Sequence, residues 1–421
     1  MKKETFYKEI IPDTPGPLEG IRMLEATTAG AGPWCGTFLA DMGAEVTKIE
    51  MPRMGDMSRY SPDPKVDLRT LVNKPDLSDL EGGMLHQSIN RNKKGITLDL
   101  RKPQGQEIFK GIGRHMDVIL ENFRPGVMDG WGLGYDDVVK VKPDIIYTSV
   151  SGYGQYGPYS YKPGYDPIGQ AMSGLMSISG FPDGPPTKTG NAMADNITGW
   201  QGAMGTMAAL LYRYRTGKGQ HVDACLLDAC LYTTSHGIMA ASNGYVQDRT
   251  GNRYANRTVA NVFHCQDGHV FICAVIDSHW ARLCRAMGRE ELIDNPRAAS
   301  MSLRSQNNEW IEGIVTTWME GLTVDQALGA LDEAGIVSAP IYDFAQVVSD
   351  GHIREREMIS EVEHPHLGQL TLYGVAPKLS RTPGKVRSPA PLLGQHNKEV
   401  YGNYLGYTTP KLEELQEEGI I

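Results

Sequence analysis

Short apolar runs alternate with stretches of helical spacing through the N-terminal third of the chain. The runs are rich in the aliphatic and β-branched residues typical of buried strands, and they lie at residues 21–25, 44–50, 94–100, 118–121 and 145–150. Helical spacing separates them at residues 34–42, 103–113 and 135–141. Gly43 follows the first of these helices, where a left-handed residue commonly ends a helix. This alternation predicts an α/β fold with an open, mainly parallel, Rossmann-like doubly wound sheet.

The pattern changes further along the chain. Residues 52–81 are polar, contain several prolines and show no period, so we predict a long surface excursion there. Residues 196–215 place apolar side chains on one helical face and predict a long helix, which the turn at 216–219 ends. We predict three segments: residues 1–224 as the N-terminal part of a large α/β domain, residues 225–335 as a small domain, and residues 336–421 as the return to the large domain.

Composition excludes several classes of protein. The chain has 421 residues, of which 40% are hydrophobic and 22% are charged, as in ordinary globular proteins. Its net charge of -9 argues against binding to nucleic acid or to an anionic membrane. No run of about 18 apolar residues predicts a membrane span, and the N-terminus lacks the apolar core of a secretory signal. We expect a cytoplasmic protein.

The spacing of cysteine and histidine does not favour metal or disulfide chemistry. The six cysteines are scattered and form no Cys-x-x-Cys pair, so we expect free thiols in a reducing compartment. The histidines show neither His-x-x-x-His nor His-Glu-x-x-His spacing, and we predict no metal site. The chain also lacks a Gly-x-Ser-x-Gly elbow for a nucleophilic serine.

Asp195 is the acidic residue with the clearest potential for chemistry. It stands just before the long predicted helix, where aspartate commonly serves as an N-cap. The amide groups and the dipole of a helix start also keep a carboxylate ionised, and an ionised carboxylate is a competent nucleophile toward an activated acyl group. The residues themselves leave both interpretations open.

Other segments could contact a ligand. The turn at 30–33 could bring a phosphate to a helix N-terminus, although it matches no phosphate-binding motif and a tight turn explains it equally well. Asn122 and Arg124 follow a buried strand, and open α/β sheets bind ligands beyond the carboxyl ends of their strands. We interpret the basic cluster at 90–94 as a solvated charge run.

Together these segments resemble the class III CoA-transferases of the CaiB–BaiF type. The resemblance covers nearly the whole chain, and its specificity comes from the order and spacing of stretches that are each modest. They are residues 29–33 (AGAGP), 40–50 (ADMGAEVTKIE), 90–99 (NRNKKGITLD), 121–126 (ENFRPG), 149–154 (SVSGYG), 164–174 (GYDPIGQAMSG), 215–220 (RTGKGQ) and 335–340 (GIVSAP). A succinyl-CoA-dependent, benzylsuccinate-type member is one form that the resemblance admits.

The resemblance implies a fold, a reaction and a set of site residues. The implied fold has a large α/β domain made from both chain ends, a small central domain, and two subunits that interlock as a dimer. The implied reaction moves CoA from an acyl-CoA, commonly succinyl-CoA, to a carboxylic acid through an aspartyl anhydride and an aspartyl-CoA thioester on Asp195. CoA and acyl-CoA are then substrates, with no tightly bound cofactor. The implied CoA contacts are Gly30, Ala31, Arg53, Leu98, Asp99, Arg101, Asn122, Phe123, Arg124, Tyr165 and Asp166.

Alternatives stay open within this resemblance. The α-methylacyl-CoA racemases share the fold, but they use a histidine where this chain has Tyr165. A CoA-binding subunit of a heteromeric transferase is a second alternative, so the implied assembly is a homodimer, or a heterodimer or heterotetramer with a related chain. Pro163 replaces a lysine of some relatives, and Lys162 is the candidate substitute. The acceptor acid is aromatic or dicarboxylic, and residues 153–165 carry five tyrosines that could line its pocket.

Overall fold

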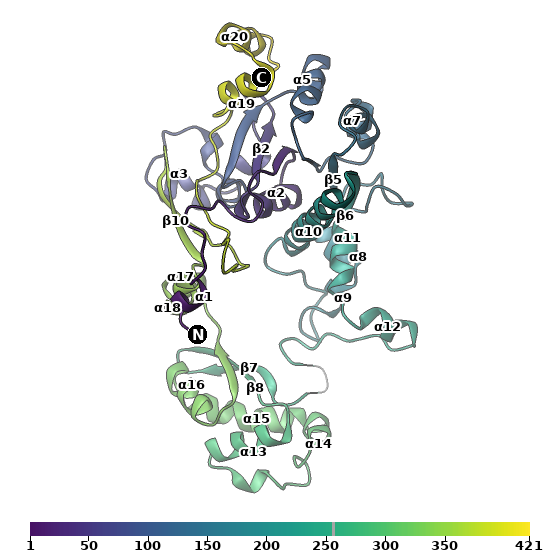
Figure 1. Ribbon diagram of the computed structural model, residues 1–421. Helices are drawn as coiled ribbons and strands as arrows, with labels where there is room; N and C mark the ends of the chain where they lie inside the picture. Colours follow the sequence, from purple (N-terminus) through teal and green to yellow (C-terminus); the bar gives the residue numbers. More distant parts are fainter. Residues whose placement is uncertain (255–256) are drawn as a thin grey trace. The chain divides into compact units, whose positions relative to one another are not determined.

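The computed structural model describes residues 1–254 and 257–421, which form two compact units (Figure 1). The first unit consists of Met1–Leu175, Thr189–Ser235 and Gly351–Ile421, so it is built from segments that precede and follow the second unit in the sequence. The second unit consists of Met176–Lys188 and His236–Asp350. The three-segment division drawn from the sequence, with boundaries at residues 225 and 336, stays a prediction.

A six-stranded parallel sheet forms the centre of the first unit. Its strand order is β3-β2-β1-β4-β5-β6, the order of a doubly wound sheet. The strands are β1 Arg22–Ala26, β2 Glu45–Glu50, β3 Lys93–Thr97, β4 Val118–Glu121, β5 Ile146–Ser151 and β6 Gln220–Cys225. Every neighbouring pair is parallel. The predicted α/β fold with a parallel sheet is confirmed.

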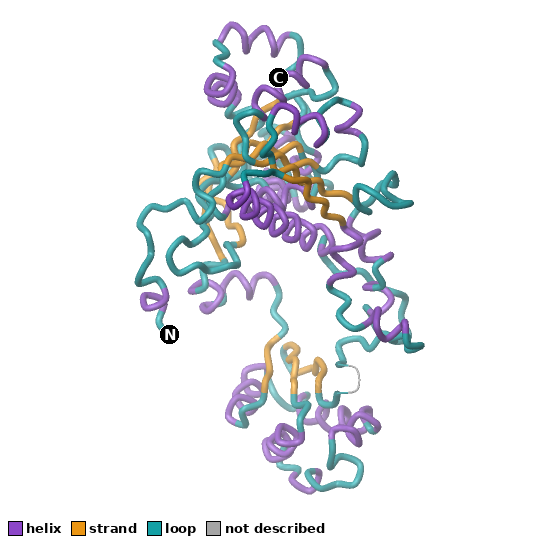
Figure 2. The backbone as a smooth tube through the Cα atoms, turned by 45° about the vertical axis from the view of Figure 1, so that its right-hand side comes forward, coloured by secondary structure: helices purple, strands orange, loops and turns teal. Residues whose placement is uncertain are grey.

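Helices cover both faces of this sheet (Figure 2). One face packs against α5, α7, α19 and α20, with Phe109 and Tyr401 in the core. The other packs against α2 and α10, where a Cβ atom at Gly199 would collide with Trp34, so the helices approach closely. The helices are α1 Lys3–Phe6, α2 Ala31–Asp41, α3 Leu68–Leu71, α4 Met84–Ile89, α5 Pro103–Gly113, α6 Val127–Gly130, α7 Tyr135–Val141, α8 Asp166–Met172, α10 Met193–Thr216, α11 Leu226–Tyr232, α18 Gly351–Glu355, α19 Asn397–Leu405 and α20 Thr409–Glu417.

Glycines end the two helices that matter most for the site. Gly43 has φ +100° just after α2, and Gly217 has φ +72° at the end of α10, so both predicted helix ends are confirmed. An antiparallel hairpin, β10 Ile359–His364 and β11 Gly368–Tyr373, completes the first unit. No helix in the two described ranges is both long and apolar enough to cross a membrane.

The segment between β2 and β3 differs in part from the surface excursion predicted for residues 52–81. It contains short helical turns at Met57–Arg59, Pro64–Val66 and Asp79–Glu81, besides α3. Arg59 is fully buried and binds both oxygens of the Glu50 carboxylate at 2.6 Å. The predicted surface position is confirmed for most of residues 52–81, and the buried exceptions are Asp56, Ser58, Arg59, Asp67 and Glu81.

The second unit has its own core beneath a small antiparallel sheet. Its strands, in the order β7-β8-β9, are Ala260–Cys265, Gly268–Cys273 and Val337–Pro340. Its helices are α12 Gly237–Ser242, α13 Asp277–Ala286, α14 Met301–Gln306, α15 Asn308–Met319, α16 Val324–Glu333 and α17 Phe344–Ser349, with α9 Leu175–Ile178 at the border and a helical turn at Glu290–Leu292. Trp280 and Phe263 lie in the core.

Candidate active site

The first unit has a cavity at the point where the sheet reverses its direction of winding. β1 and β4 are neighbours from which the chain winds to opposite sides, and such sheets bind ligands beyond the carboxyl ends of these strands. A cavity of about 170 Å³ lies here. Its walls are residues 28–31 after β1, 122–125 after β4, 150–152 at the end of β5 and the loop at 162–165, together with Met57, Asp195 and Leu226.

Asp195 lies in the first turn of α10 and is not its N-cap. The N-cap is Ala192, which makes no side-chain capping bond. Asp166 from α8 caps the helix instead: its Oδ1 accepts the amide of Ala194 at 2.6 Å and that of Asp195 at 3.2 Å. The N-cap interpretation of Asp195 was therefore wrong, because a carboxylate from a different helix satisfies these amides. The Asp195 side chain is left to line the cavity.

The charge state of Asp195 also differs from the prediction. Burial, with a contribution from the like charge of Asp166, raises the pKa of Asp195 to about 7. The helix start therefore does not keep this carboxyl fully ionised at neutral pH. A carboxyl in a cavity whose pKa is raised in this way is a candidate for catalysis.

The turn between β1 and α2 touches the Asp195 carboxyl. A Cβ atom at Gly30 would overlap Oδ2 of Asp195 and crowd the ring of Trp34, so only glycine fits there. Because α2 begins at Ala31, the amides of Ala31 and Gly32 have no acceptor within the helix. These amides are at the positive end of the helix dipole, beside a carboxyl group that could carry out acyl chemistry.

Two side chains hold this turn in place. Asp56 Oδ1 accepts the hydroxyl of Thr28 and the amide of Ala29, each at 3.1 Å. The side chain of Asn122 accepts the Thr28 amide at 2.8 Å and donates to the Thr28 carbonyl at 2.7 Å. Ala29 has φ +65°, a left-handed conformation that these bonds stabilise.

A buried chain of charges lies behind the turn. Lys48 Nζ is 2.9 Å from Asp56 Oδ2 and 3.5 Å from Glu25 Oε1, and Lys93 Nζ is 2.9 Å from Glu25 Oε2. Burial disfavours the charged form of Asp56, but the Lys48 ammonium outweighs it and holds the pKa of Asp56 well below its usual range. The turn against Asp195 is thus anchored to an internal network of ion pairs.

The basic cluster at 90–94 contributes to this interior. Arg91 is fully buried and pairs with Asp41 at 2.7 Å, with its guanidinium 4.0 Å above the ring of Tyr373. Lys93 belongs to the buried network, whereas Lys94 pairs with Glu45 nearer the surface. The interpretation of this cluster as a solvated charge run was wrong, because its partners come from distant parts of the chain.

A second cavity of about 260 Å³ adjoins the first through Phe123, which lines both. Leu98, Leu100 and Trp131 contribute apolar walls, and the rings of Phe123 and Trp131 meet edge to face with centroids 5.2 Å apart. Arg101 lines the same space. The pair of cavities can hold an extended ligand with a flat, apolar group at one end and a reactive group beside Asp195.

Most of the site residues expected from the sequence lie in these walls. The first cavity is lined by Gly30, Ala31, Asn122, Phe123, Arg124, Tyr165 and Asp195. The second is lined by Leu98, Arg101 and Phe123. Asp99 lies behind the wall and pairs with Arg101 at 2.8 Å, and Asp166 caps α10. Arg53 lines neither cavity and has φ +66°.

Other residues in the walls carry no recognisable signal in the sequence. Thr28, Met57 and Leu226 line the first cavity, and Glu50 and Asp56 line the second. Asp56 accepts the amide of Ser58 at 2.9 Å, a local turn contact that carries no sign of a ligand site. Their roles depend on contacts far apart in the sequence.

Two cations border the first cavity in the part of the chain that the structure describes, Arg124 and Lys162. Lys162 lies with its ammonium 4.1 Å above the ring of Tyr159, and Tyr159 meets Tyr153 edge to face. An ammonium held in this way stays directed along the rim of the cavity. The site therefore presents positive charge to an anionic ligand beside Asp195.

Known proteins share this sequence and architecture. A family model described as CoA-transferase family III matches residues 18–397. The chain is 38% identical to the succinyl-CoA–D-citramalate CoA-transferase of Chloroflexus aurantiacus, over 97% of this chain and 98% of that protein. It is 35% identical to the succinyl-CoA–L-malate CoA-transferase beta subunit of the same organism, over 96% and 98%. A crystal structure of a CAIB/BAIF family protein from Brucella suis matches with a TM-score of 0.82 at 30% identity, over 93% of this chain and 100% of that chain.

Proposed function

This chain belongs to CoA-transferase family III and is a CoA-transferase, and we propose that it takes CoA from succinyl-CoA and passes it to a dicarboxylic acid through covalent intermediates on Asp195. The resemblance drawn from the sequence is confirmed at the level of the family, the fold and the enzyme class. The single observation that carries the proposed mechanism is the Asp195 carboxyl, which lines a cavity against the N-terminus of α2.

The proposed reaction exchanges acyl groups in four balanced steps. The Asp195 carboxylate attacks the thioester carbonyl of the donor and expels CoA thiolate, which leaves a mixed anhydride. The thiolate attacks the aspartyl carbonyl and expels the donor acid, which leaves an aspartyl-CoA thioester. The acceptor carboxylate attacks this thioester and re-forms an anhydride and a thiolate. The thiolate then attacks the acceptor carbonyl, giving the new acyl-CoA and free Asp195. Covalent catalysis divides one difficult exchange into easier steps.

Each step passes through an oxyanion that the site could stabilise. The first-turn amides of α2 have no helical acceptor and lie beside Asp195. The amide of Gly154 is already donated to Ser151 Oγ at 2.9 Å, so it is a weaker candidate. The pKa of Asp195, raised to about 7, leaves about half of the molecules with an ionised nucleophile at neutral pH. We therefore propose that the rate of exchange rises with pH through this range.

The two cavities fit the parts of an acyl-CoA. We propose that the adenine ring occupies the apolar space beside Phe123 and Trp131, and that the thioester lies next to Asp195. Arg101 and Arg124 are available at the walls for phosphate groups. CoA is a substrate in this scheme, and the remaining expected contacts, Arg53 and Asp99 among them, stay predictions.

The charge of the rim supports a dicarboxylic acceptor. An acceptor places one carboxylate against the Asp195 thioester, and a second carboxylate needs a cation nearby, which Lys162 can supply. The Chloroflexus relatives are named for citramalate and malate, which are dicarboxylic acids. An aromatic acceptor would depend on the tyrosines of the 153–165 loop, of which Tyr156 is 84% exposed.

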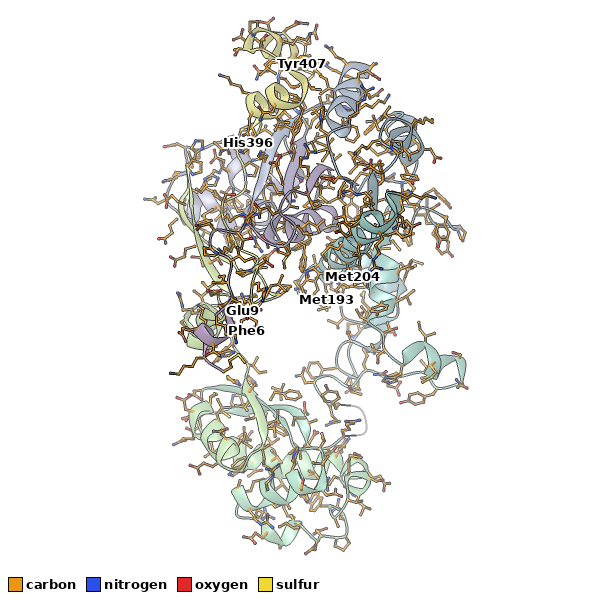
Figure 3. All side chains as sticks on the ribbon, in the orientation of Figure 1. Phe6, Glu9, Met193, Met204, His396 and Tyr407 are labelled. Atoms are coloured by element: carbon orange, nitrogen blue, oxygen red, sulfur yellow. The ribbon has the colours of Figure 1, made fainter. Side chains whose placement is uncertain are left out.

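An assembly of two or more chains is also proposed. α10 exposes large apolar side chains, with Met204 at 61% and Trp200 at 48% exposure, and Figure 3 shows Met193 and Met204 along this helix. Such a surface suits a subunit contact. The partner is a second copy or a related chain, and one relative is named as a beta subunit. The six free cysteines support the cytoplasm as the location.

Trapping of the covalent intermediate tests the mechanism. The protein is incubated with succinyl-CoA, quenched with hydroxylamine, digested, and the peptide that contains Asp195 is analysed by mass spectrometry. A hydroxamate on Asp195 and on no other carboxyl supports the proposal. An unmodified Asp195 in protein that completes exchange with succinyl-CoA would rule out the covalent route. A panel of other acyl-CoAs tests the identity of the donor.

A further inference from the structure

A row of polar side chains lies on the sheet face opposite α10 and runs from the carboxyl end of β4, across β5, to His221 near the start of β6. Glu121 ends β4 and pairs in register with Ser149 of β5. Ser149 Oγ is 2.9 Å from Nε2 of His221 on β6, and its hydroxyl favours the ionised form of the neighbouring Glu121 carboxyl. Glu121 and Ser149 are buried, whereas the ring of His221 reaches the surface. The three neighbouring side chains therefore connect solvent to a buried carboxyl.

The buried end of this path touches the site. Glu121 Oε2 accepts the amide of Phe123 at 2.8 Å. Phe123 lines both ligand cavities, and its neighbours Asn122 and Arg124 line the first. A separate cavity of about 190 Å³ lies on the other side of Arg124 and is lined by Glu121, Ser149 and His221. The carboxyl of Glu121 thus holds the backbone of the segment 122–124 from behind.

We propose that Glu121, Ser149 and His221 form a proton-sharing relay that positions the segment 122–124 and thereby makes the affinity for coenzyme A depend on pH. The inference rests on the proposed function, because it takes CoA as the ligand of the cavities beside Phe123. Glu121 is a positioning residue in this scheme, since it acts on the ligand through the Phe123 amide.

Two proton arrangements satisfy the three groups. With Glu121 protonated, its O–H donates to Ser149 Oγ, and the Ser149 O–H donates to Nε2 of a neutral His221 that carries its proton on Nδ1. With Glu121 ionised, the Ser149 O–H donates to the carboxylate and Nε2–H of His221 donates to Ser149 Oγ. The change moves one proton from Glu121 to Ser149, one from Ser149 to Nε2, and releases the Nδ1 proton to solvent.

The surroundings bring this change into the neutral pH range. Burial raises the pKa of Glu121 to about 7, with further contributions from Asp129 of α6 and Asp223 of β6. Burial also lowers the pKa of His221, so its ring is neutral there, while Asp223, Asp129 and Asp136 of α7 act in the opposite direction. Arg124 is the cation that lines the same cavity.

The rings around His221 fix it against Ser149. Its imidazole stacks on the ring of Tyr135, with centroids 5.1 Å apart and planes at 22°, and meets Tyr147 edge to face. A ring held on two sides keeps Nε2 directed at Ser149. Replacement by phenylalanine would retain this packing and remove only the hydrogen bond.

The direction of the effect follows from hydrogen-bond strength. A carboxylate is a stronger acceptor of the Phe123 amide than a neutral carboxyl group is. The segment 122–124 is therefore held more firmly above the pKa of Glu121 than below it. We expect the wild-type protein to bind CoA more tightly at pH 8 than at pH 6, by roughly fivefold relative to a variant that cannot ionise.

Calorimetric titration with coenzyme A tests the relay. The dissociation constant is measured at pH 6 and pH 8 for the wild type and for Glu121→Gln, which keeps an oxygen acceptor for the Phe123 amide and carries no titratable proton. Ionisation of the CoA phosphate affects both proteins equally. We expect the ratio of the two constants to be about fivefold smaller in Glu121→Gln. A structural role alone would weaken binding equally at both pH values and would overturn the proposal.

A pair of histidine variants supplies the matched control. His221→Phe removes the acceptor of the Ser149 hydroxyl, which leaves Ser149 free to donate to the carboxylate, so the midpoint of the pH dependence moves to lower pH. His115 also lies against a tyrosine, Tyr404, at 5.5 Å, but outside the relay, and His115→Phe should leave the profile unchanged. A wild-type profile in both variants overturns the relay. Failure of the folded wild type to bind CoA at all, checked by circular dichroism, overturns the proposed function and this inference with it.

Discussion

Two groups of carboxyls in the first unit differ in whether a lysine or arginine lies beside them. Behind the β1–α2 turn, Glu25, Glu50 and Asp56 each lie against a lysine or arginine at 2.6–2.9 Å. At the edge of the cavities, Glu121 is buried and Asp195 is half-buried, no lysine or arginine among the described residues pairs with either, and burial raises the pKa of each to about 7. The paired group forms a rigid support, whereas the unpaired group retains protons that can move at neutral pH. The lack of a paired cation, rather than burial, therefore distinguishes the carboxyls beside the cavities from those behind the β1–α2 turn.

Substitution of the unpaired nucleophile should have the largest effect. Asp195→Asn keeps the shape of the side chain but cannot attack a thioester. We expect kcat for CoA exchange to fall by roughly 10⁴-fold or more, because the covalent route is lost. Steady-state kinetics with succinyl-CoA measure this. The thermal midpoint should stay near that of the wild type, and exchange at the wild-type rate would contradict the proposed role.

Breaking the paired group should affect stability first. Lys48→Met leaves Asp56 and its neighbour Glu25 with less compensation in a fully buried place. We expect the free energy of unfolding to fall by about 3–5 kcal/mol, since an uncompensated buried charge is costly. Urea denaturation measures the loss. A change below about 1 kcal/mol would show that water or rearrangement replaces the ammonium, and the contrast between the two groups would then be weaker.

Asp166, whose charge adds to the effect of burial on the pKa of Asp195, links that pKa to the pH dependence of activity. It raises the pKa of Asp195, and the reaction needs the ionised carboxylate, so activity of the wild type should increase as pH rises through about 7. Asp166→Asn removes the like charge and retains an oxygen for the amides at the start of α10, so the rising limb of the kcat profile should move to lower pH. The loss of stability should be about 1 kcal/mol. Asp137→Asn on α7, an acid at the protein surface, is the control and should leave the limb in place.

An exposed ion pair should have the smallest effect. Lys140 and Asp137 lie three residues apart on α7 at 3.0 Å, with the lysine side chain 69% exposed. Lys140→Ala should change the free energy of unfolding by less than about 0.5 kcal/mol, because solvent screens the pair. Chemical denaturation of this variant and of Lys48→Met compares the two losses in the free energy of unfolding. A larger loss in Lys48→Met would show that a buried ion pair stabilises this protein more than an exposed one. Equal losses in the two variants would contradict that view.

The sequence predicted those features that depend on neighbouring residues. The first five strands of the sheet, the two long helices around the site and the glycines that end them follow from local periodicity and left-handed positions. The position of the site at the carboxyl ends of β1 and β4 follows from the order of elements. Asp195 as a nucleophile came from the resemblance, since an aspartate at a helix start is usually a cap.

The features that were missed depend on distant partners. Arg91 looks like a surface residue until Asp41, fifty positions earlier, is placed against it. Asp166 caps α10 from another helix, which moves Asp195 from the cap into the cavity wall. The polar strand β6, with His221 and Asp223 exposed, lacks the apolar pattern of its neighbours because it lies at the edge of the sheet. A single sequence does not specify which charges will meet.

The interrupted construction of the first unit has a consequence for the order in which the protein matures. During synthesis the ribosome delivers β1 to α11, then residues 236–350 of the second unit, and only afterwards α18 to α20. Tyr401 and Asn397, which bond Thr97 of β3, are therefore delivered last. The second unit can close its own core first, while one face of the sheet still lacks α19 and α20. A nascent chain of this protein would thus depend most on chaperones while residues 236–350 are being synthesised.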